Sequence, residues 1–214
     1  MTKKIITALV LRCCAADMSS QNGFIWPGVG GIATAPDWID NKECGSGLHG
    51  WLYGQGDHSS STYWEDANSK WLVVEVAESS IRMLGGKCKF PSGKVVFVGS
   101  KVAAAAYIIA KEPRAASVAV IGAVLEVGER GAVQGGDLSV LTGGYFAKMT
   151  GGNSAKMTGG DSATMSGGYF AVMHFLYWDG KRRRTVVGYV GEDGIEANVA
   201  YHLDAARHLV KVQS

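Results

Sequence analysis

The sequence has little proline, little net charge and no long apolar run. Proline accounts for 4 of the 214 residues, and the formal net charge is +2. Because the charge is nearly balanced, we expect neither nucleic acid nor an acidic ligand as a partner. No stretch reaches the ~18 apolar residues that a membrane-spanning helix needs, so we expect no membrane association either.

Cysteine is also scarce, and its spacing excludes the commonest metal and redox motifs. The 4 cysteines are Cys13, Cys14, Cys44 and Cys88, and none belongs to a CxxC pair. This pattern predicts no metal site and no disulfide, and it favours a reducing, cytoplasmic location. The sequence contains no cofactor motif, so we expect no cofactor.

Residues 1–112 predict a mixed, β-rich domain that ends in a helix. Apolar and β-branched runs predict strands at Ile5–Leu11, Trp71–Val76 and Lys94–Val98. The helix is predicted at Lys101–Lys111, because Ser100 can cap its start and Pro113 prevents its continuation. The stretch 16–69 is rich in Gly, Ser, Trp and Asp, and a loop of that length is usually functional.

Glycine is abundant, and its distribution reveals a repeat. The chain has 30 glycines, and pairs of them return at a fixed spacing. The octapeptides at 135–174 are GGDLSVLT, GGYFAKMT, GGNSAKMT, GGDSATMS and GGYFAVMH. Their first two positions are always Gly, the fifth is Ser or Ala, and the seventh is Leu or Met. Repetition in register is typical of a solenoid.

The pattern predicts that each octad forms half of a β-solenoid coil. Positions five and seven point inward on a short strand, so small and long side chains together fill a narrow interior. We expect the paired glycines to supply positive φ at the corners. The predicted fold is mainly β: an N-terminal α+β domain (1–112), a short β-solenoid or β-helix (113–174) and a C-terminal β-hairpin cap (175–214) that covers open sheet edges.

The motif Cys44-Gly-Ser-Gly-Leu-His-Gly50 resembles an uncharacterised family of phage and bacterial proteins. In that family a domain with a C-G-x-G-L-H-G loop precedes glycine-rich short repeats. Further matching segments are Phe24–Pro27, Ala35–Trp38, Trp71–Val76 and Val187–Ile195. The resemblance implies a phage or prophage protein that acts in the host-cell cytoplasm, and it carries no established activity.

The octads are separately similar to the repeats of bacterial ice nucleation proteins, whose octad ends in Thr-x-Thr. Only Thr164-Met-Ser166 approaches that ending here. The array is also too short to template ice, so this likeness implies the fold and not the function.

Cys44 and His49 are the candidate catalytic residues, because a thiolate paired with an imidazole can act as a nucleophile. The pair could instead be half of a zinc site, or it could belong to a structural turn. The surrounding region is rich in aromatic side chains, which suit a pocket for a ligand or a peptide. The candidate binding residues of this region are Trp26, Trp38, His49, Trp51, Tyr53 and Asp57.

The second candidate binding segment is the densest run of positive charge, Lys181, Arg182, Arg183 and Arg184. It could grip phosphate or a nucleic acid, or it could be a solvated loop beside a hairpin turn. The pairs Tyr145-Phe146 and Tyr169-Phe170 recur at coil corners, where they either fill the core or contact another chain. A homo-oligomer could therefore form through these corners or through the open end of the solenoid.

Three functions are compatible with these features. The leading hypothesis is a phage or prophage accessory protein that binds a host protein or protein complex and blocks an antiviral defence. The less favoured alternative is an enzyme whose Cys/His site lies in the 44–57 loop and acts on a nucleotide-like or peptide substrate. The third is a purely structural β-solenoid module.

Overall fold

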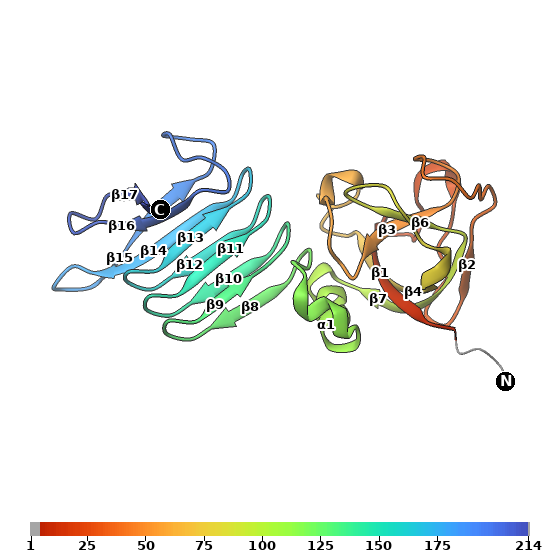
Figure 1. Cartoon of the computed structure of the whole chain (residues 1–214), viewed down its shortest axis with the longest axis horizontal. Coiled ribbons are helices and arrows are strands. Elements are labelled where there is room, and N and C mark those ends of the chain that lie inside the picture. Colours follow the sequence, from red (N-terminus) through yellow and green to blue (C-terminus); the bar gives the residue numbers. More distant parts are fainter. Residues whose placement is uncertain (1–4, 214) are drawn as a thin grey trace. The chain divides into compact units, whose positions relative to one another are not determined.

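The computed structural model describes residues 5–213 and confirms a mainly β fold that includes a β-solenoid (Figure 1). The chain forms two compact units, one ending at Ser117 and the other beginning at Val118. Within residues 5–213 the one α-helix is α1 (Lys101–Lys111), and no helix is long and apolar enough to cross a membrane.

The first unit contains a seven-stranded sheet in which every pair of neighbours is antiparallel. The strand order is β2-β7-β4-β1-β3-β6-β5. The strands are β1 (Thr7–Cys14), β2 (Ile32–Thr34), β3 (Leu48–Leu52), β4 (Lys70–Ala77), β5 (Arg82–Met83), β6 (Cys88–Phe90) and β7 (Ser92–Gly99). Short 3-10 helices lie at Gln21–Gly23, His58–Ser60, Glu78–Ser80 and Pro113–Ser117.

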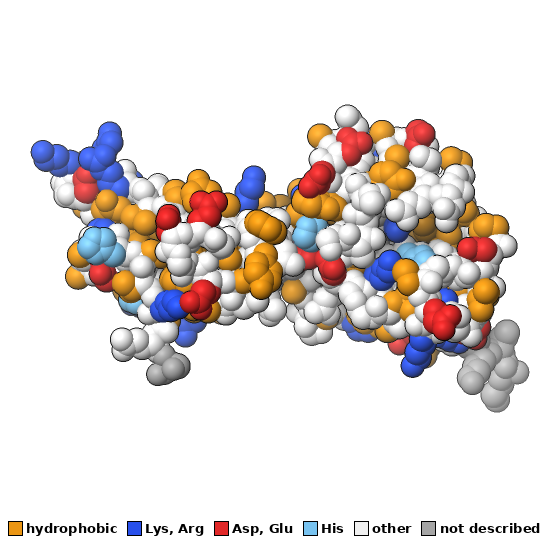
Figure 2. All heavy atoms as spheres, turned by 90° about the horizontal axis from the view of Figure 1, so that it is seen from above, with side chains coloured by type: hydrophobic (Ala, Val, Ile, Leu, Met, Phe, Trp, Pro, Cys, Tyr) orange, Lys and Arg blue, Asp and Glu red, His pale blue; other side chains and the backbone are white. Residues whose placement is uncertain are grey.

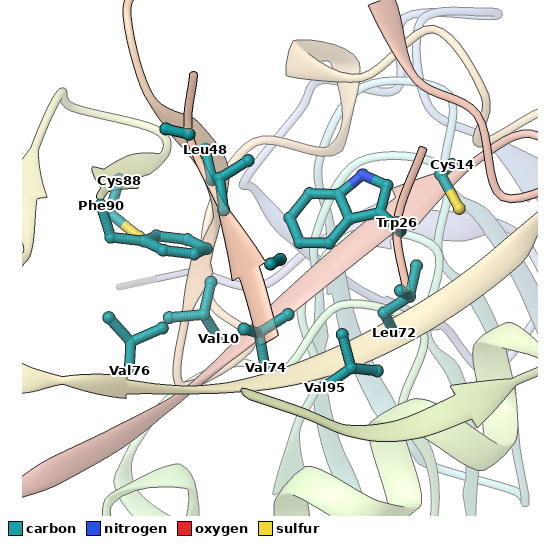
Figure 3. Close-up of a cluster of buried hydrophobic side chains, with 12 residues drawn as sticks. Val10, Cys14, Trp26, Leu48, Leu72, Val74, Val76, Cys88, Phe90 and Val95 are labelled. Atoms are coloured by element: carbon teal, nitrogen blue, oxygen red, sulfur yellow. The ribbon is translucent and has the colours of Figure 1, made fainter. Parts of the chain in front are cut away.

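Strand β1 lies at the centre of the sheet because its apolar residues are buried on both faces. Val10 and Cys14 belong to a core cluster with Leu72 and Trp26, which Figure 3 shows. Leu9, Leu11 and Cys13 alternate with them and are buried as well. Helix α1 packs against β1, β4 and β7, and its buried residues are Ala104, Ala105 and Ile108.

The predicted helix of the first unit is confirmed, and its strand pattern needed two corrections. The Ser100 side chain accepts a hydrogen bond from the Ala103 N–H at 3.3 Å, as a helix cap should. Strand β1 continues through Cys13 and Cys14, because both thiols are fully buried and extend the apolar run. The stretch 16–69 is not one loop, since it contains β2 and β3.

The second unit is a β-solenoid of about three coils in which each octad forms half a coil. Alternate octads lie in two five-stranded sheets, ordered β15-β14-β12-β10-β8 and β17-β16-β13-β11-β9. The strands are β8 (Val124–Val127), β9 (Ala132–Gln134), β10 (Val140–Gly143), β11 (Lys148–Gly151), β12 (Lys156–Gly159), β13 (Thr164–Gly167), β14 (Val172–Trp178), β15 (Arg183–Tyr189), β16 (Ala200–Leu203) and β17 (Leu209–Lys211).

The interior of the solenoid is filled as predicted. Equivalent residues of successive coils pair in register, so Leu141 lies beside Met157, and Met149 beside Met165. The inward side chains at positions five and seven are 0–2% exposed in Ala147, Met149, Ala155, Met157, Ala163, Met165, Ala171 and Met173.

The paired glycines have a different role from the one predicted. Positive φ occurs at position four of the octads, for example 57° at Phe146 and 56° at Ser154, and not at the glycines. A Cβ on Gly143 would lie 2.6 Å from the Cβ of Ala147, inside the coil. A Cβ on Gly144 would lie 2.8 Å from the backbone nitrogen of Glu129, in the preceding coil. The glycines are therefore required by close approach and not by their φ.

Two C-terminal hairpins cap the solenoid. Strand β15 pairs with β14, and β16 pairs with β13, both in the antiparallel sense. Val190, Tyr201 and Leu203 are buried against the last residues of the solenoid core. The cap thus covers the end of the apolar interior with side chains that do not belong to the repeat.

Ala155→Leu should lower the free energy of unfolding by about 1–3 kcal/mol, because the larger side chain overpacks the interior. Ala155 is fully buried. The control is Lys156→Ala, which truncates the exposed neighbour and should change stability by less than about 0.5 kcal/mol. Urea unfolding measures both, and a normal stability of Ala155→Leu would contradict the filled interior.

Gly144→Ala should destabilise by about 1–3 kcal/mol, whereas Gly128→Ala should be nearly silent. Both glycines precede a corner, but a Cβ on Gly128 would meet no atom within 4 Å, while one on Gly144 would meet the backbone of Gly128 and Glu129. Thermal unfolding of the two variants distinguishes two effects on stability. Close approach of the coils should affect only Gly144→Ala, whereas the loss of glycine's backbone flexibility should affect both variants. Equal effects would show that close approach of the coils is not the constraint.

Candidate functional site

A pocket of about 430 Å³ opens in the first unit, next to the start of β3. Its walls combine Arg12 of β1 with the segments 20–26, 44–49 and 60–63 and with Lys87. Segments that are distant in the sequence meet here because β1 and β3 are neighbours in the sheet. Three predicted site residues line the pocket, namely Trp26, Cys44 and His49.

Three buried polar atoms of the pocket walls have no hydrogen-bond partner among residues 5–213. They are Nε of Arg12, Nε1 of Trp26 and Nε2 of His49. Buried polar groups nearly always have a partner, and one without a partner costs about 1–3 kcal/mol. Within residues 5–213 the only other such atom is Oγ of Ser139, in the second unit. The three atoms therefore belong to side chains that line one pocket.

Arg12 brings a positive charge to the pocket. It follows Val10 by two positions in β1, so it lies on the sheet face that carries the core cluster. Its guanidinium lies 5.8 Å from the ring centre of Trp26, and no carboxylate of the described chain forms a salt bridge with it. Burial lowers the pKa of Arg12 from its ordinary value, yet guanidinium stays charged in proteins. An unpaired cation here favours an anionic partner.

Trp26 offers a donor whose direction is fixed by the core. The side chain is 3% exposed and packs edge-on against Phe24, with ring centres 5.3 Å apart. In Figure 3 the ring lies over Leu72 and Val95, with its nitrogen on the side away from them. The indole N–H is therefore held in place by packing and can only donate.

His49 is neutral at physiological pH. Burial and then the charges of Lys87 and Arg12 lower its pKa to about 4. The imidazole forms a hydrogen bond with the backbone of Gly47, which leaves Nε2 as the nitrogen without a partner. A neutral ring that donates through its other nitrogen presents a lone pair at Nε2.

The electrostatic balance of the pocket is positive. Arg12 and Lys87 contribute cations, and the one carboxylate of the lining, Asp37, already accepts the Gly47 N–H at 3.0 Å. Two donors and one acceptor in a positive environment suit a small organic anion. They do not suit a metal ion, which requires anionic or neutral ligands.

Cys44 is exposed on the wall of the same pocket. As a catalytic base its partner His49 would be weak, because a pKa of about 4 lies far from neutral pH. The hypothesis of a Cys44–His49 nucleophile stays a prediction that this environment does not favour.

The other predicted residues of the first unit do not line the pocket. Trp51 is 1% exposed, stacks on Trp71 with ring centres 5.7 Å apart, and donates its N–H to the Asp57 carbonyl at 2.8 Å. The Asp57 side chain caps a 3-10 helix by accepting the Ser59 N–H. These contacts give Trp51 and Asp57 structural roles.

Trp38 and Tyr53 each lie beneath a cation. The ammonium of Lys89 is 5.4 Å from the ring centre of Trp38, and the guanidinium of Arg114 is 4.5 Å from that of Tyr53. Arg114 also bonds to Glu112 and Glu78, so Tyr53 belongs to a network of ion pairs. The remaining predicted residues, Lys181, Arg182, Arg183 and Arg184, lie in the second unit.

Sequence reasoning missed Arg12 and Lys87, which line the pocket. Arg12 had a signal that could have revealed it, since it interrupts an otherwise apolar run in Thr7–Cys14. A charged residue in the middle of a buried strand is rarely placed there by packing alone. Lys87 lies in an irregular segment that gives no such signal.

These two units, a mixed β domain with a pocket and a β-solenoid, also differ in their similarities to known proteins. Residues 8–110 match a family model described as a domain of unknown function (DUF7666). No solved structure gives a significant match to the chain.

About half of the chain is similar to the repeat region of ice nucleation proteins. It is 38% identical over 112 residues to the ice nucleation protein of Pseudomonas syringae, which covers 51% of this chain and 10% of that protein. It is 37% identical over 103 residues to ice nucleation protein InaU of Pantoea ananas, covering 47% of this chain and 10% of that protein. The chain thus spans about a tenth of the length of these relatives.

Lowering the pH from about 6.5 to about 4 should destabilise the wild type more than His49→Gln. The pKa of His49 is lower in the folded state than in the unfolded one, so the unfolded state binds the proton first. The contribution to stability is complete above pH 6.5 and is lost as the pH falls towards 4.

The measurement is urea unfolding of both proteins across this range. Carboxylates titrate in both, so the difference between the two curves isolates His49. A difference that does not change with pH would contradict a buried, neutral imidazole.

Proposed function

We propose that the first unit binds a small organic anion in this pocket, and that the solenoid is a structural module attached to it. The observation that carries the proposal is the set of unpartnered atoms on Arg12, Trp26 and His49. A carboxylate or phosphate oxygen can accept from both the guanidinium and the indole N–H. A hydroxyl or amine on the same molecule can donate to His49.

The size of the pocket supports this class of ligand. Its volume of about 430 Å³ lies within the range of small-molecule sites. The Trp26 donor is positioned by the core, so little ordering is needed when a ligand binds. The site thus combines fixed polar groups with apolar walls.

The similarity of the solenoid to ice nucleation proteins supports a structural role for the second unit. Outward positions of adjacent coils pair Thr142 with Thr158, but also Lys148 with Thr164 and Lys156 with Val172. The charged and bulky members interrupt any regular hydroxyl array. We therefore propose that this chain uses the repeat as a scaffold and not to template ice.

The hypothesis of a phage or prophage protein that blocks a host defence stays a prediction. The pocket is compatible with it only if the bound anion belongs to a signalling or defence system of the host. Neither the family match nor the relatives supply support for such a role.

Arg12→Met should abolish binding of an anion while leaving the free protein at least as stable as the wild type. The change removes a half-buried charge that forms no ion pair within residues 5–213, so the free energy of unfolding should stay the same or rise. Isothermal titration with citrate, adenosine monophosphate and inorganic phosphate measures binding, and thermal unfolding measures stability. We expect one of these probes to bind the wild type at a single site.

Two further variants sharpen this test. Trp26→Phe keeps an aromatic ring but removes the N–H, and should weaken the binding of the probe about fivefold or more. Lys70→Met removes an exposed charge from β4 and should leave binding intact. An Arg12→Met protein that is destabilised by more than ~1 kcal/mol, together with no probe bound by the wild type, would show that Arg12 is structural.

A further inference from the structure

The hairpin β14–β15 of the second unit extends beyond the coils and carries the basic run at its tip. Strand β14 pairs with β12 only over Val172–Phe175, whereas its pairing with β15 continues to Trp178. Lys181, Arg182, Arg183 and Arg184 are all exposed. Figure 2 shows lysine and arginine side chains gathered at one end of this unit.

Most of the charge at this tip is not neutralised. Arg184 bonds to Asp179 at 2.6 Å. Backbone N–H groups and Arg184 lower the pKa of Asp179 to about 2, so its carboxylate is already engaged in the turn. Lys181, Arg182 and Arg183 form no salt bridge with any residue in 5–213. These three cations are therefore available to a partner.

An aromatic pocket of about 470 Å³ lies beside one of these cations, Arg183. Its walls include Tyr145 of a coil corner and Trp178 of the hairpin, which are 50% and 58% exposed. Arg183 also lines it and is the cross-strand partner of Trp178. The acidic residue of the lining, Asp161, is paired with Arg207 at 3.0 Å. The pocket thus joins flat apolar surfaces to positive charge.

We propose that this surface, formed by Tyr145, Trp178 and Lys181–Arg183, binds single-stranded nucleic acid. Bases stack on the two exposed rings, and phosphates contact the three free cations. The combination favours a single strand over a duplex, because the bases of a duplex are stacked on one another and do not offer their faces. The proposal departs from the expectation based on net charge, because charge that is balanced over the chain can still be concentrated locally. It is independent of the function proposed for the first unit.

The test is fluorescence anisotropy with a labelled oligothymidylate of about 15 nucleotides. We expect binding that weakens steeply between about 50 and 200 mM salt. Trp178→Ala should weaken it about tenfold or more, through lost stacking. The matched control is Tyr169→Ala, which removes a 63% exposed ring from a different corner and should not change the affinity.

Charge is tested separately by Arg182→Ala, with Lys148→Ala as control. Arg182→Ala should reduce the slope of log Kd against log salt by about 0.7, and Lys148→Ala should leave it unchanged. Thermal unfolding verifies that all variants are folded. Two results would overturn the proposal. The first is the absence of binding at about 50 mM salt. The second is an affinity for the oligonucleotide that Trp178→Ala does not change, together with equally tight binding of heparin, a polyanion that has no bases.

Discussion

Backbone hydrogen bonds between successive coils hold them about 4.8 Å apart, and most of the second unit's sequence follows from that distance. At this spacing a Cβ on the second glycine of an octad would collide with the preceding coil, as one on Gly152 would with Gly136 and Asp137. The first glycine and the small fifth residue share the interior with a long seventh residue. Side chains that join coils obey the same spacing, since Asn153 N–H bonds to Asp137 and Tyr169 N–H to Asn153.

The first unit is organised by a different constraint, the burial of β1 on both faces. A strand in this position should carry only apolar residues, and Arg12 departs from that rule. Its cost is reduced by the cation–π contact with Trp26 but not by an ion pair. Places where a sequence breaks a local rule are often functional. The pocket around Arg12 fits that generalisation.

The sequence predicted the solenoid well because each coil repeats one local solution. The register, the inward alanines and methionines and the bounds of α1 could all be read from spacing and caps. The role of the glycines could not, since close approach between coils is a property of the stack and not of one octad. Of the proposed site residues, Cys44, His49 and Trp26 line the pocket, whereas Trp51 lies in the core. The sequence could not separate these two cases, because a core and a binding site can have the same density of aromatic residues.

The separation of inward from outward positions explains why a repeat can keep its fold while its surface changes. Interior spacing fixes Gly, Ala and Met, whereas the outward neighbours Lys156 and Val172 differ freely between paired coils. Sequence similarity between two proteins that share this repeat therefore reflects the fixed interior positions and says little about their surfaces. A non-repeating surface is easiest to build where the repeat ends. There β14 extends beyond the end of its neighbour β12. Trp178 and Arg183 are cross-strand partners in this extension, where no further coil has to pack against them.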